Sequence, residues 1–257
     1  TQADLAAHRT PVVEATGADV FGGRLYTPAS WTQGPALTQA LQILDASGIA
    51  RRAPQSVEAC HMMIEALKLA LVDREAYYGD PDFVDVPMEA LLSPAYAASR
   101  AALIDMTAAI QPLPPAGDIA ERSTKSPSPA AAPNEEAVTL DTSVAAVIDG
   151  TGNIFASTPS DPSFDGPVVP ELGFVISTRG AQSYVEADHP ACLAAGKRPR
   201  VSAYPMIFRG ENGRHIAGGG PGADLQLQAM TQVLAGHLAH DLGLSEATKA
   251  PRVFTHG

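Results

Sequence analysis

The sequence predicts an α/β protein in which helices are layered on a β-sheet. Two stretches, residues 35–48 and 56–78, carry apolar residues at helical spacing. Two others, residues 144–148 and 204–208, are short apolar runs with the composition of strands. A glycine-rich turn at residues 218–224 stands between a strand pattern and a helix pattern. Since each of these elements must bury its apolar face against another, we expect a shared core.

The first half of the chain is expected to be mostly helical. Residues 23–32 have the composition of an extended, hairpin-like segment. A helix should begin at Pro35, because proline suits the first helical turn, and it should end at Gly48. Its expected apolar face carries Leu37, Leu41 and Leu44.

A second helix is the strongest local prediction. Ser56 is a suitable N-cap, and the sequence Gly79-Asp80-Pro81 stops a helix, so this one should run to about Tyr78. A third helix is expected from Pro94 to about Ile110. The residues expected along one face of the second helix are Val57, His61, Ile64, Leu67, Leu71 and Arg74.

The second half follows a proline-rich run that has too few apolar residues to form a core. Residues 144–148 should then form a core strand that ends in a tight turn at residues 149–153. A helix is expected from about Asp224 to Asp241. Further strands are expected at residues 154–158, 173–177, 204–208 and 215–217, the last two joined by a turn at residues 211–213.

Composition limits the classes of function. No apolar run approaches the roughly 18 residues of a transmembrane helix. The net charge of −11 argues against a nucleic-acid partner, because binding a polyanion needs clustered Lys and Arg. Two cysteines, Cys60 and Cys192, are too few for a disulfide framework. The first residues do not resemble a signal peptide, which leaves the compartment open: cytoplasmic, or periplasmic or secreted if the chain is truncated.

Thr142 is the candidate nucleophile. It lies between the proline-rich run and the strand predicted at residues 144–148. This arrangement suits an enzyme that cleaves its own chain before Thr142 and then uses the freed α-amine as the base for the Thr142 hydroxyl. The high strand propensity of threonine explains the same position without catalysis, so position alone does not decide between the two interpretations.

Several stretches of the chain resemble γ-glutamyltransferases. Thr142 stands seven residues before Asp149, as the nucleophilic threonine of that family stands before the Asp of a Val-Val-Asp-x-x-Gly-Asn turn. Residues 65–87 are similar to the large-subunit signature of the family, and residues 244–252 to its Glu-Ala-x-x-Ala-Pro-Arg segment. The resemblance covers nearly the whole chain.

This resemblance implies the N-terminal-nucleophile hydrolase fold, an αββα sandwich. Residues 1–110 would correspond to the C-terminal part of a large subunit, residues 111–141 to a processing linker, and residues 142–257 to a small subunit that begins with the nucleophile, all in one intertwined domain. The resemblance also implies that the chain is truncated at both ends and lacks a family Arg that clamps the substrate carboxylate.

The resemblance also implies the roles of individual residues. Gly222 and Ala223, after Pro221, match a Pro-Gly-Gly turn whose N–H groups form the oxyanion hole of the family. Ser160 stands where the family has a threonine that hydrogen-bonds the nucleophile. Ser202 matches one of two serines that bind the substrate α-carboxylate.

Other positions depart from the family pattern. Gln182 replaces the acidic residue that holds the α-amine of a glutamyl group, and Pro162 replaces an asparagine. The segment that begins at Arg179 is similar to an Arg-Gly-Ala segment of oxamate amidohydrolase-like proteins, a divergent branch. We therefore take Arg179, Gln182 and Ser202 as the candidate substrate-binding residues, and we expect a free γ-glutamyl headgroup to bind poorly.

No cofactor and no metal are expected. The pattern Gly218-x-Gly220-x-x-Ala223 also fits a dinucleotide fingerprint, but the acid that would complete it, Asp241, ends a helix where the fingerprint needs a second strand. His61 has no second ligand at suitable spacing. The pair His237 and His240 lies near a helix C-terminus, where the helix dipole favours such residues.

We therefore expect a γ-glutamyltransferase-like amidohydrolase or acyltransferase that cleaves itself before Thr142. Its substrate would be a small γ-glutamyl-type or related amide, its acceptor water or an amine, and its two fragments would stay together as a heterodimer. Neither a nucleic acid nor a membrane is an expected partner. The competing hypothesis is an unprocessed, inactive relative that serves as a binding or assembly module.

Overall fold

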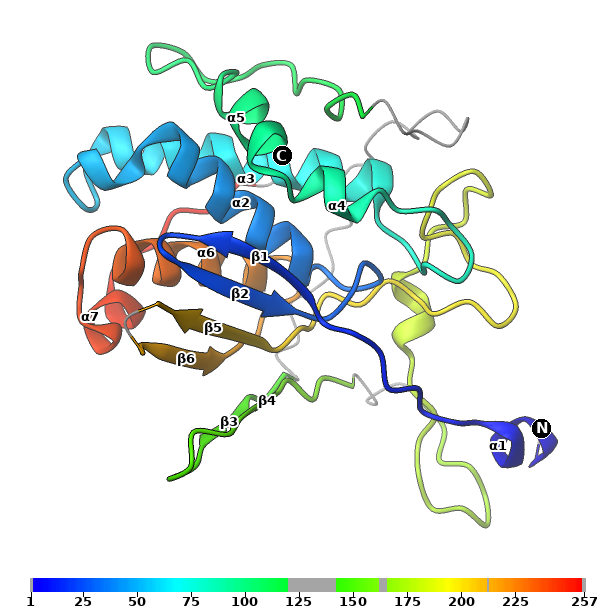
Figure 1. Ribbon diagram of the computed structural model, residues 1–257. Coiled ribbons are helices and arrows are strands. Elements are labelled where there is room, and N and C mark those ends of the chain that lie inside the picture. The colour runs from blue at the N-terminus through cyan, green and yellow to red at the C-terminus, as the bar shows by residue number, and fades with distance from the viewer. Residues whose placement is uncertain (1, 120–141, 162–165, 212, 256–257) are drawn as a thin grey trace.

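The computed structural model describes residues 2–119, 142–161, 166–211 and 213–255 (Figure 1). Helices lie against a four-stranded sheet, and a two-stranded hairpin lies on the other side (Figure 1). Two 3-10 turns are present, η1 (Ile49–Arg51) and η2 (Arg179–Gln182). The α-helices are α1 (Gln2–Ala7), α2 (Gly34–Ser47), α3 (Val57–Tyr77), α4 (Met88–Leu91), α5 (Pro94–Ala101), α6 (Leu225–Leu238) and α7 (Leu244–Lys249).

The four-stranded sheet joins strands from both halves of the chain. Its order is β1-β2-β5-β6, and all neighbours are antiparallel. In the central pair, Leu25 of β2 lies opposite Phe208 of β5, and both side chains are buried. Residues before and after Thr142 therefore build one sheet. The strands are β1 (Thr16–Val20), β2 (Gly23–Thr27), β5 (Met206–Gly210) and β6 (His215–Gly218).

Helix α2 lies at the centre of the core. Every residue from Gly34 to Leu44 is buried, because the helix contacts β1 and β2 as well as α3, α5 and α6. Pro35 lies in its first turn, and Gly48 ends it in the left-handed conformation with φ of 75°. The predicted start and end of this helix are confirmed.

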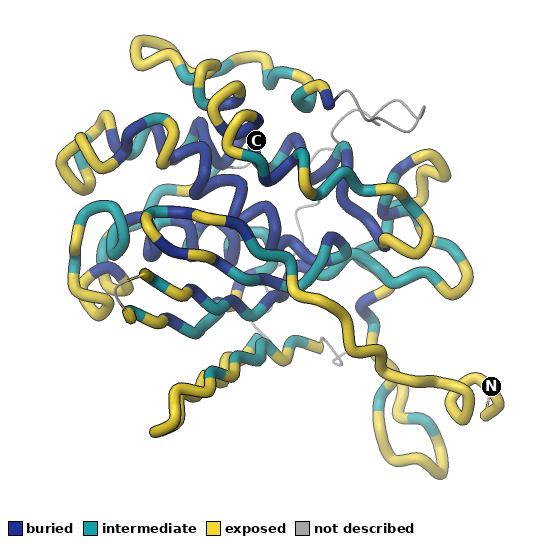
Figure 2. The backbone as a smooth tube through the Cα atoms, in the orientation of Figure 1, coloured by how far each residue is buried: buried dark blue, intermediate teal, exposed yellow. Residues whose placement is uncertain are grey.

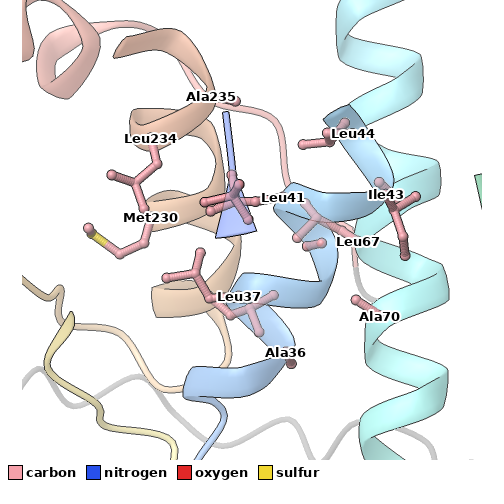
Figure 3. Packing of buried hydrophobic residues seen from close by; sticks show 14 of the residues in the cluster. Ala36, Leu37, Leu41, Ile43, Leu44, Leu67, Ala70, Met230, Leu234 and Ala235 are labelled. Carbon is pink, nitrogen blue, oxygen red and sulfur yellow. The ribbon is translucent and has the colours of Figure 1, made fainter. Parts of the chain in front are cut away.

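Leucines and smaller apolar residues fill the space between α2 and its neighbours. Figure 3 shows Leu37 and Leu41 on the side of α2 that faces α6, and Ile43 on the side that faces α3. Each of these three side chains has 0% of its surface exposed. Buried residues are concentrated in α2, α3, α6 and the adjoining strands (Figure 2). Burial of each such side chain contributes about 1.5–3 kcal/mol, so this layer is the main source of stability.

Helix α3 confirms the second predicted helix but not its predicted face. Ser56 caps it, because the Ser56 hydroxyl accepts a hydrogen bond of 3.1 Å from the Ala59 N–H. Of the residues expected along one face, Leu67 and Arg74 are buried, whereas Val57, the first residue of the helix, is 82% exposed. Met62 and Leu69, which lie outside the expected face, are also buried. The helix carries apolar residues around most of its circumference, so their spacing did not single out one face.

Two strand predictions need correction. The segment at residues 23–32 forms β2 only as far as Thr27, and its hairpin partner is β1, which the sequence did not predict. Residues 173–177 do not form a strand, since only an isolated bridge joins Val168 and Val175. The cause is local: Glu171 and Gly173 both adopt positive φ values, 71° and 72°, and turn the chain there.

Two predicted helices end early. The helix expected at residues 94–110 is α5, which ends at Ala101. Beyond it, the Asp105 carboxylate accepts hydrogen bonds from the N–H and hydroxyl of Thr107, a local turn that competes with a helix. The helix expected to reach Asp241 is α6, which ends at Leu238, and Asp241 itself has φ of 54°.

The hairpin of β3 (Ala145–Ile148) and β4 (Ile154–Ser157) follows Thr142 in the chain. We expected β3 in the core, but all four of its residues are exposed (Figure 2). The hairpin contacts β5 and β6 yet has no third strand bonded to it in the described residues, so side chains such as Val147 stay in solvent. Most of the predicted processing linker, residues 120–141, lies outside the described residues.

The central position of α2 predicts a large cost for shortening one of its leucines. Leu41→Ala should lower the free energy of unfolding by about 2–5 kcal/mol, because a cavity replaces fully buried methyl groups. Val57→Ala, the matched control, should change it by less than about 0.5 kcal/mol, since Val57 is exposed. Urea unfolding monitored by circular dichroism measures both values, and equal losses would contradict the packing described.

Candidate active site

Thr142 lies at the open end of the β3–β4 hairpin. The N–H of the next residue, Ser143, donates to the Pro159 carbonyl over 2.9 Å, which extends the hairpin pairing beyond the end of β4 at Ser157. Ser160 then lies beside Thr142, and their hydroxyl oxygens are 2.7 Å apart. Both side chains are half-buried. The hairpin therefore brings two hydroxyl groups from positions eighteen residues apart into hydrogen-bond contact.

A buried arginine completes this group. Arg179, in η2, is only 9% exposed and donates through Nη2 to both the carbonyl and the hydroxyl oxygen of Ser160, the latter over 3.0 Å. A Ser160 oxygen that accepts from Arg179 can direct its own hydrogen toward Thr142 Oγ1. A positive charge that polarises Ser160 in this way would stabilise negative charge as it develops on the Thr142 oxygen.

The glycine-rich turn before α6 carries two consecutive residues with positive φ, and Gly222 is buried while Ala223 is half-buried. Gly222 has φ of 110°, and Ala223 has φ of 47°, in the left-handed region. In the described part of the chain neither amide N–H donates to a backbone carbonyl, so both are available to a substrate oxygen. Gly219 brings this turn close to the hairpin, because a Cβ added there would lie 2.6 Å from Thr158 Oγ1.

Gln226, in the first turn of α6, links the glycine turn to Thr142. Its side chain is 1% exposed, and its Nε2 lies 3.5 Å from Thr142 Oγ1. Its backbone N–H donates to the Ala223 carbonyl over 3.1 Å. The buried Oε1 of Gln226 has no hydrogen-bond partner among the described residues. The same helical turn thus carries the candidate oxyanion donors and a carboxamide directed at the candidate nucleophile.

Gln33 ties the glycine turn to the candidate substrate-binding residues. Its side-chain Nε2, buried at the start of α2, donates to the carbonyls of Ser202 and Ala223 over 2.7 and 2.9 Å. Ser202 in turn exchanges two hydrogen bonds of 3.2 Å with the side chain of Gln182. Two of the three residues expected to contact substrate are therefore hydrogen-bonded to each other.

A cluster of charged side chains at the C-terminal end of α3 lies behind the turn. Arg74 donates to Gln33 Oε1 over 2.8 Å, to Glu75 Oε1 over 2.8 Å and to Asp224 Oδ2 over 3.0 Å. Arg200 contacts both Asp224 carboxylate oxygens, over 2.7 and 2.8 Å. Two cations and two carboxylates thus balance in charge.

Burial alone would disfavour the charged forms of these groups. Burial raises the pKa of Asp224, but the charges of Arg74 and then Arg200 outweigh it and hold that pKa at about 2. Burial likewise tends to lower the pKa of Arg74, while Asp224 and Glu75 more than offset this and raise it. Asp224 and Arg74 are therefore both charged at neutral pH.

The structure brings together all seven residues that the sequence singled out. Hydrogen bonds link Thr142, Ser160 and Arg179, and separately Gln182 and Ser202, while Gln33 and Gln226 connect these groups to the glycine turn. Sequence reasoning gave no role to the following residues: Gln33, Arg74, Asp224 and Gln226. Gln226 follows the glycine turn within one helical turn, a spacing that could have pointed to it.

Neither a metal-binding group nor a membrane-spanning helix is found among the described residues. Within residues 2–119, 142–161, 166–211 and 213–255, no group of three or more His, Cys, Asp and Glu side chains is arranged to hold a metal ion. None of the helices in these ranges is long and apolar enough to cross a membrane. His61 is half-buried and its Nε2 lies 2.8 Å from the Asp105 carbonyl oxygen.

Comparison with known proteins places the chain in a family. A model of the Gamma-glutamyltranspeptidase family matches residues 1–257. The chain is 32% identical to the Acylase ACY 1 proenzyme of Pseudomonas sp. (strain SE83), over 100% of this chain and 43% of that protein. The chain belongs to the γ-glutamyltranspeptidase family. It is also 28% identical to the Oxamate amidohydrolase proenzyme of Klebsiella pneumoniae, over 98% of this chain and 44% of that protein.

The fold of this family member matches that of a solved acylase. The crystal structure of cephalosporin acylase from Bacillus halodurans aligns with a TM-score of 0.75 at 28% identity, over 98% of this chain and 42% of that one. The predicted N-terminal-nucleophile hydrolase class is thereby confirmed. The chain spans less than half the length of the relatives it matches. The described residues supply one helical layer, one sheet and the hairpin of that sandwich.

The dinucleotide interpretation of the glycine turn finds no support in this architecture. A dinucleotide fingerprint joins a strand and a helix of a parallel βαβ unit. Here β6 is an edge strand of an antiparallel sheet, and no further strand follows α6 in the described residues.

The backbone of the turn predicts that exchanges at Gly222 and at Ala223 change stability by unequal amounts. Gly222→Ala should lower the free energy of unfolding by about 1–3 kcal/mol, because φ of 110° strains any residue with a Cβ. The space itself is adequate, since the nearest atom would be Leu225 Cβ at 3.5 Å. Ala223→Gly should change stability by no more than about 1 kcal/mol, because relief of left-handed strain offsets the added freedom of the unfolded chain. Thermal unfolding measures the stability of both variants. A Gly222→Ala protein as stable as the unchanged protein would contradict the described backbone.

Proposed function

We propose that this chain is the catalytic region of an amidohydrolase or acyltransferase that uses Thr142 as its nucleophile. The single observation that carries the proposal is the contact between Thr142 and Ser160, which Arg179 supports from a buried position. A threonine of purely structural importance needs neither a second hydroxyl at 2.7 Å nor a cation behind that hydroxyl. The hydrolases and acylases among the relatives support the same class of reaction.

The chain first acts on itself. Thr142 Oγ attacks the carbonyl carbon of Asp141, the peptide C–N bond breaks, and water then hydrolyses the resulting ester. The products are a carboxylate at Asp141 and a free α-amine at Thr142, which is the base that an N-terminal nucleophile requires. The two relatives named above are both called proenzymes, which supports such processing here.

The processed enzyme then acts on an external amide. The α-amine of Thr142 accepts the hydroxyl proton as Oγ bonds to the substrate carbonyl carbon, and the N–H groups of Gly222 and Ala223 stabilise the negative oxygen. The amide C–N bond breaks, the protonated α-amine returns the proton to the leaving nitrogen, and an ester on Thr142 remains. Water or an amine then attacks that ester and restores the hydroxyl.

The substrate-binding residues favour an acyl group without an ammonium substituent. Gln182 is neutral and already exchanges two hydrogen bonds with Ser202, so it offers no charge to an α-amine. Arg179 adds a cation close to the nucleophile. The names acylase and oxamate amidohydrolase among the relatives support amides other than γ-glutamyl amides as substrates.

The two fragments produced by cleavage are proposed to stay together. Strand β2 pairs with β5 across the division at Thr142, and Gln33 and Arg74 from the first fragment bond to Ser202 and Asp224 of the second. These contacts lie in the sheet and in the buried cluster. Separation would expose both, so the processed protein is expected to behave as a heterodimer.

The proposal predicts that one hydroxyl controls both reactions. Thr142→Ala should abolish self-cleavage and amide turnover, whereas Thr142→Ser should keep part of each because it retains an attacking oxygen. Intact-mass measurement after purification detects the two fragments that meet at Thr142. Ser143→Ala is the matched control and should cleave and turn over as the unchanged protein does, since its side chain is exposed. Two fragments from Thr142→Ala would mean that an external protease cuts the chain.

Substrate preference provides a second test. A γ-glutamyl anilide should give a kcat/KM roughly ten- to a hundredfold below that of a simple acyl anilide, because one charge-assisted contact of about 1.5–3 kcal/mol is missing. Gln182→Glu should raise kcat/KM for the γ-glutamyl compound and not for the simple acyl compound. The control Gln55→Glu, at an exposed position, should change neither. Efficient γ-glutamyl turnover by the unchanged chain would rule out this assignment of Gln182.

A further inference from the structure

Within the cluster of charged side chains, Asp224 is the residue that immediately follows the glycine turn. Its two carboxylate oxygens accept from Arg74, on α3, and from Arg200, on the segment before β5. The Arg74 side chain is 7% exposed, that of Arg200 19% and that of Asp224 37%. Two cations from separate parts of the chain thus hold one carboxylate at the start of α6.

The turn that Asp224 follows is not stable by local geometry alone. Gly222 has φ of 110° and Ala223 has φ of 47°. Residues that carry a Cβ, such as Ala223, rarely adopt a positive φ. External contacts must therefore hold the turn. Gln33 binds the Ala223 carbonyl, and the two arginines bind the next side chain, so the turn is held at both points.

We propose that Asp224 is a positioning residue, which through Arg74 and Arg200 holds the first turn of α6 so that the Gly222 and Ala223 N–H groups and the Gln226 side chain face Thr142. The inference rests on the proposed function for its catalytic meaning. Its structural part, that the two arginines hold the turn, is independent of the proposed function. Arg74 lies in the segment before Thr142 and Asp224 in the segment after it, so one half of the chain fixes the donor loop of the other.

The contacts of Arg74 and Arg200 with the Asp224 carboxylate, here called the clamp, are expected to be insensitive to pH over the range used for assays. Arg74 and Arg200 face Asp224 as cations and Glu75 faces it as an anion, and the cations hold the pKa of Asp224 at about 2. A carboxyl group with a lowered pKa contributes stability above its ordinary pKa of about 3.9 and loses it only as pH falls through the lowered value. Between pH 5 and 9 Asp224 therefore stays charged.

Kinetics of Asp224→Asn test the catalytic part of the inference. We expect kcat for a simple acyl anilide to fall at least tenfold with KM changed less than twofold, because a displaced donor loop weakens contacts to the transition state more than contacts to the substrate. The pH profile should keep its shape between pH 5 and 9. Asp224→Glu, which keeps the charge, should recover part of the loss. Asp19→Asn removes an exposed carboxylate that pairs with Arg24 over 3.0 Å and should leave kcat unchanged.

Amide hydrogen exchange tests the structural part without any assay of activity. The N–H of Leu225 donates to the Gly222 carbonyl over 2.8 Å, and that of Gln226 to the Ala223 carbonyl over 3.1 Å. In Asp224→Asn both amides should exchange at least tenfold faster, while the amides of Val233 and Leu234 in the middle of α6 should be unchanged.

The two measurements separate the failure of this inference from the failure of the proposed function. If the unchanged protein neither cleaves itself nor turns over an amide, the proposed function is wrong, and the exchange rates still decide whether the clamp holds the turn. If the unchanged protein is active and Asp224→Asn matches it in kcat and in exchange, the inference is overturned and the function stands. Faster exchange throughout α6 would also overturn it, because Asp224 would then be needed for the helix as a whole.

Discussion

The buried guanidinium of Arg74 is the constraint on which the site depends. A buried cation needs acceptors around it, and Arg74 finds them in Gln33, Glu75 and Asp224. Gln33 and Glu75 lie before Thr142 in the chain and Asp224 lies after it, so the full set of acceptors is present only when the two halves are assembled. Gln33, which Arg74 holds through its Oε1, donates through Nε2 to the carbonyls of Ser202 and Ala223. The positions of Ser202, a candidate substrate-binding residue, and of the glycine turn are therefore linked to the burial of one charge.

The candidate nucleophile lies on a different kind of element. Thr142 begins a hairpin whose strands are largely exposed, so apolar packing does little to place it. Its position depends on polar contacts: Ser160 and, through it, Arg179 on one side, and Gln226 on the other. The glycine turn is thus held by contacts from Gln33 and the charged cluster, whereas the candidate nucleophile is held by hydrogen bonds on a largely exposed hairpin.

Sequence reasoning succeeded where the signal is local. Pro35 and Gly48 bound α2, and Ser56 caps α3, because caps and breakers act within a few residues. It failed where neighbours decide the outcome. Strand β1 has the sequence Thr-Gly-Ala-Asp-Val, with no strong apolar alternation, and forms because β2 offers it a partner. The run 173–177 looks more like a strand than β1 does, yet Gly173 turns the chain, and among the residues that the structure describes only an isolated bridge at Val175 pairs with this run.

The site divides in the same way. The family resemblance supplied seven residues by position, and hydrogen bonds join them into one region. The pairing of Arg74 with Asp224, separated by 150 residues, leaves no local trace in the sequence.

In the proposed reaction, Thr142 forms the covalent bond to the acyl group. The most direct measurement is to mix the purified protein with a simple acyl anilide, quench with acid within the first turnover, digest, and locate the added acyl mass by peptide mass spectrometry. We predict the acyl group on the peptide that begins with Thr142, lost again on longer incubation in water. Turnover of the anilide with the acyl group on another residue, or with none on the protein, would contradict the account.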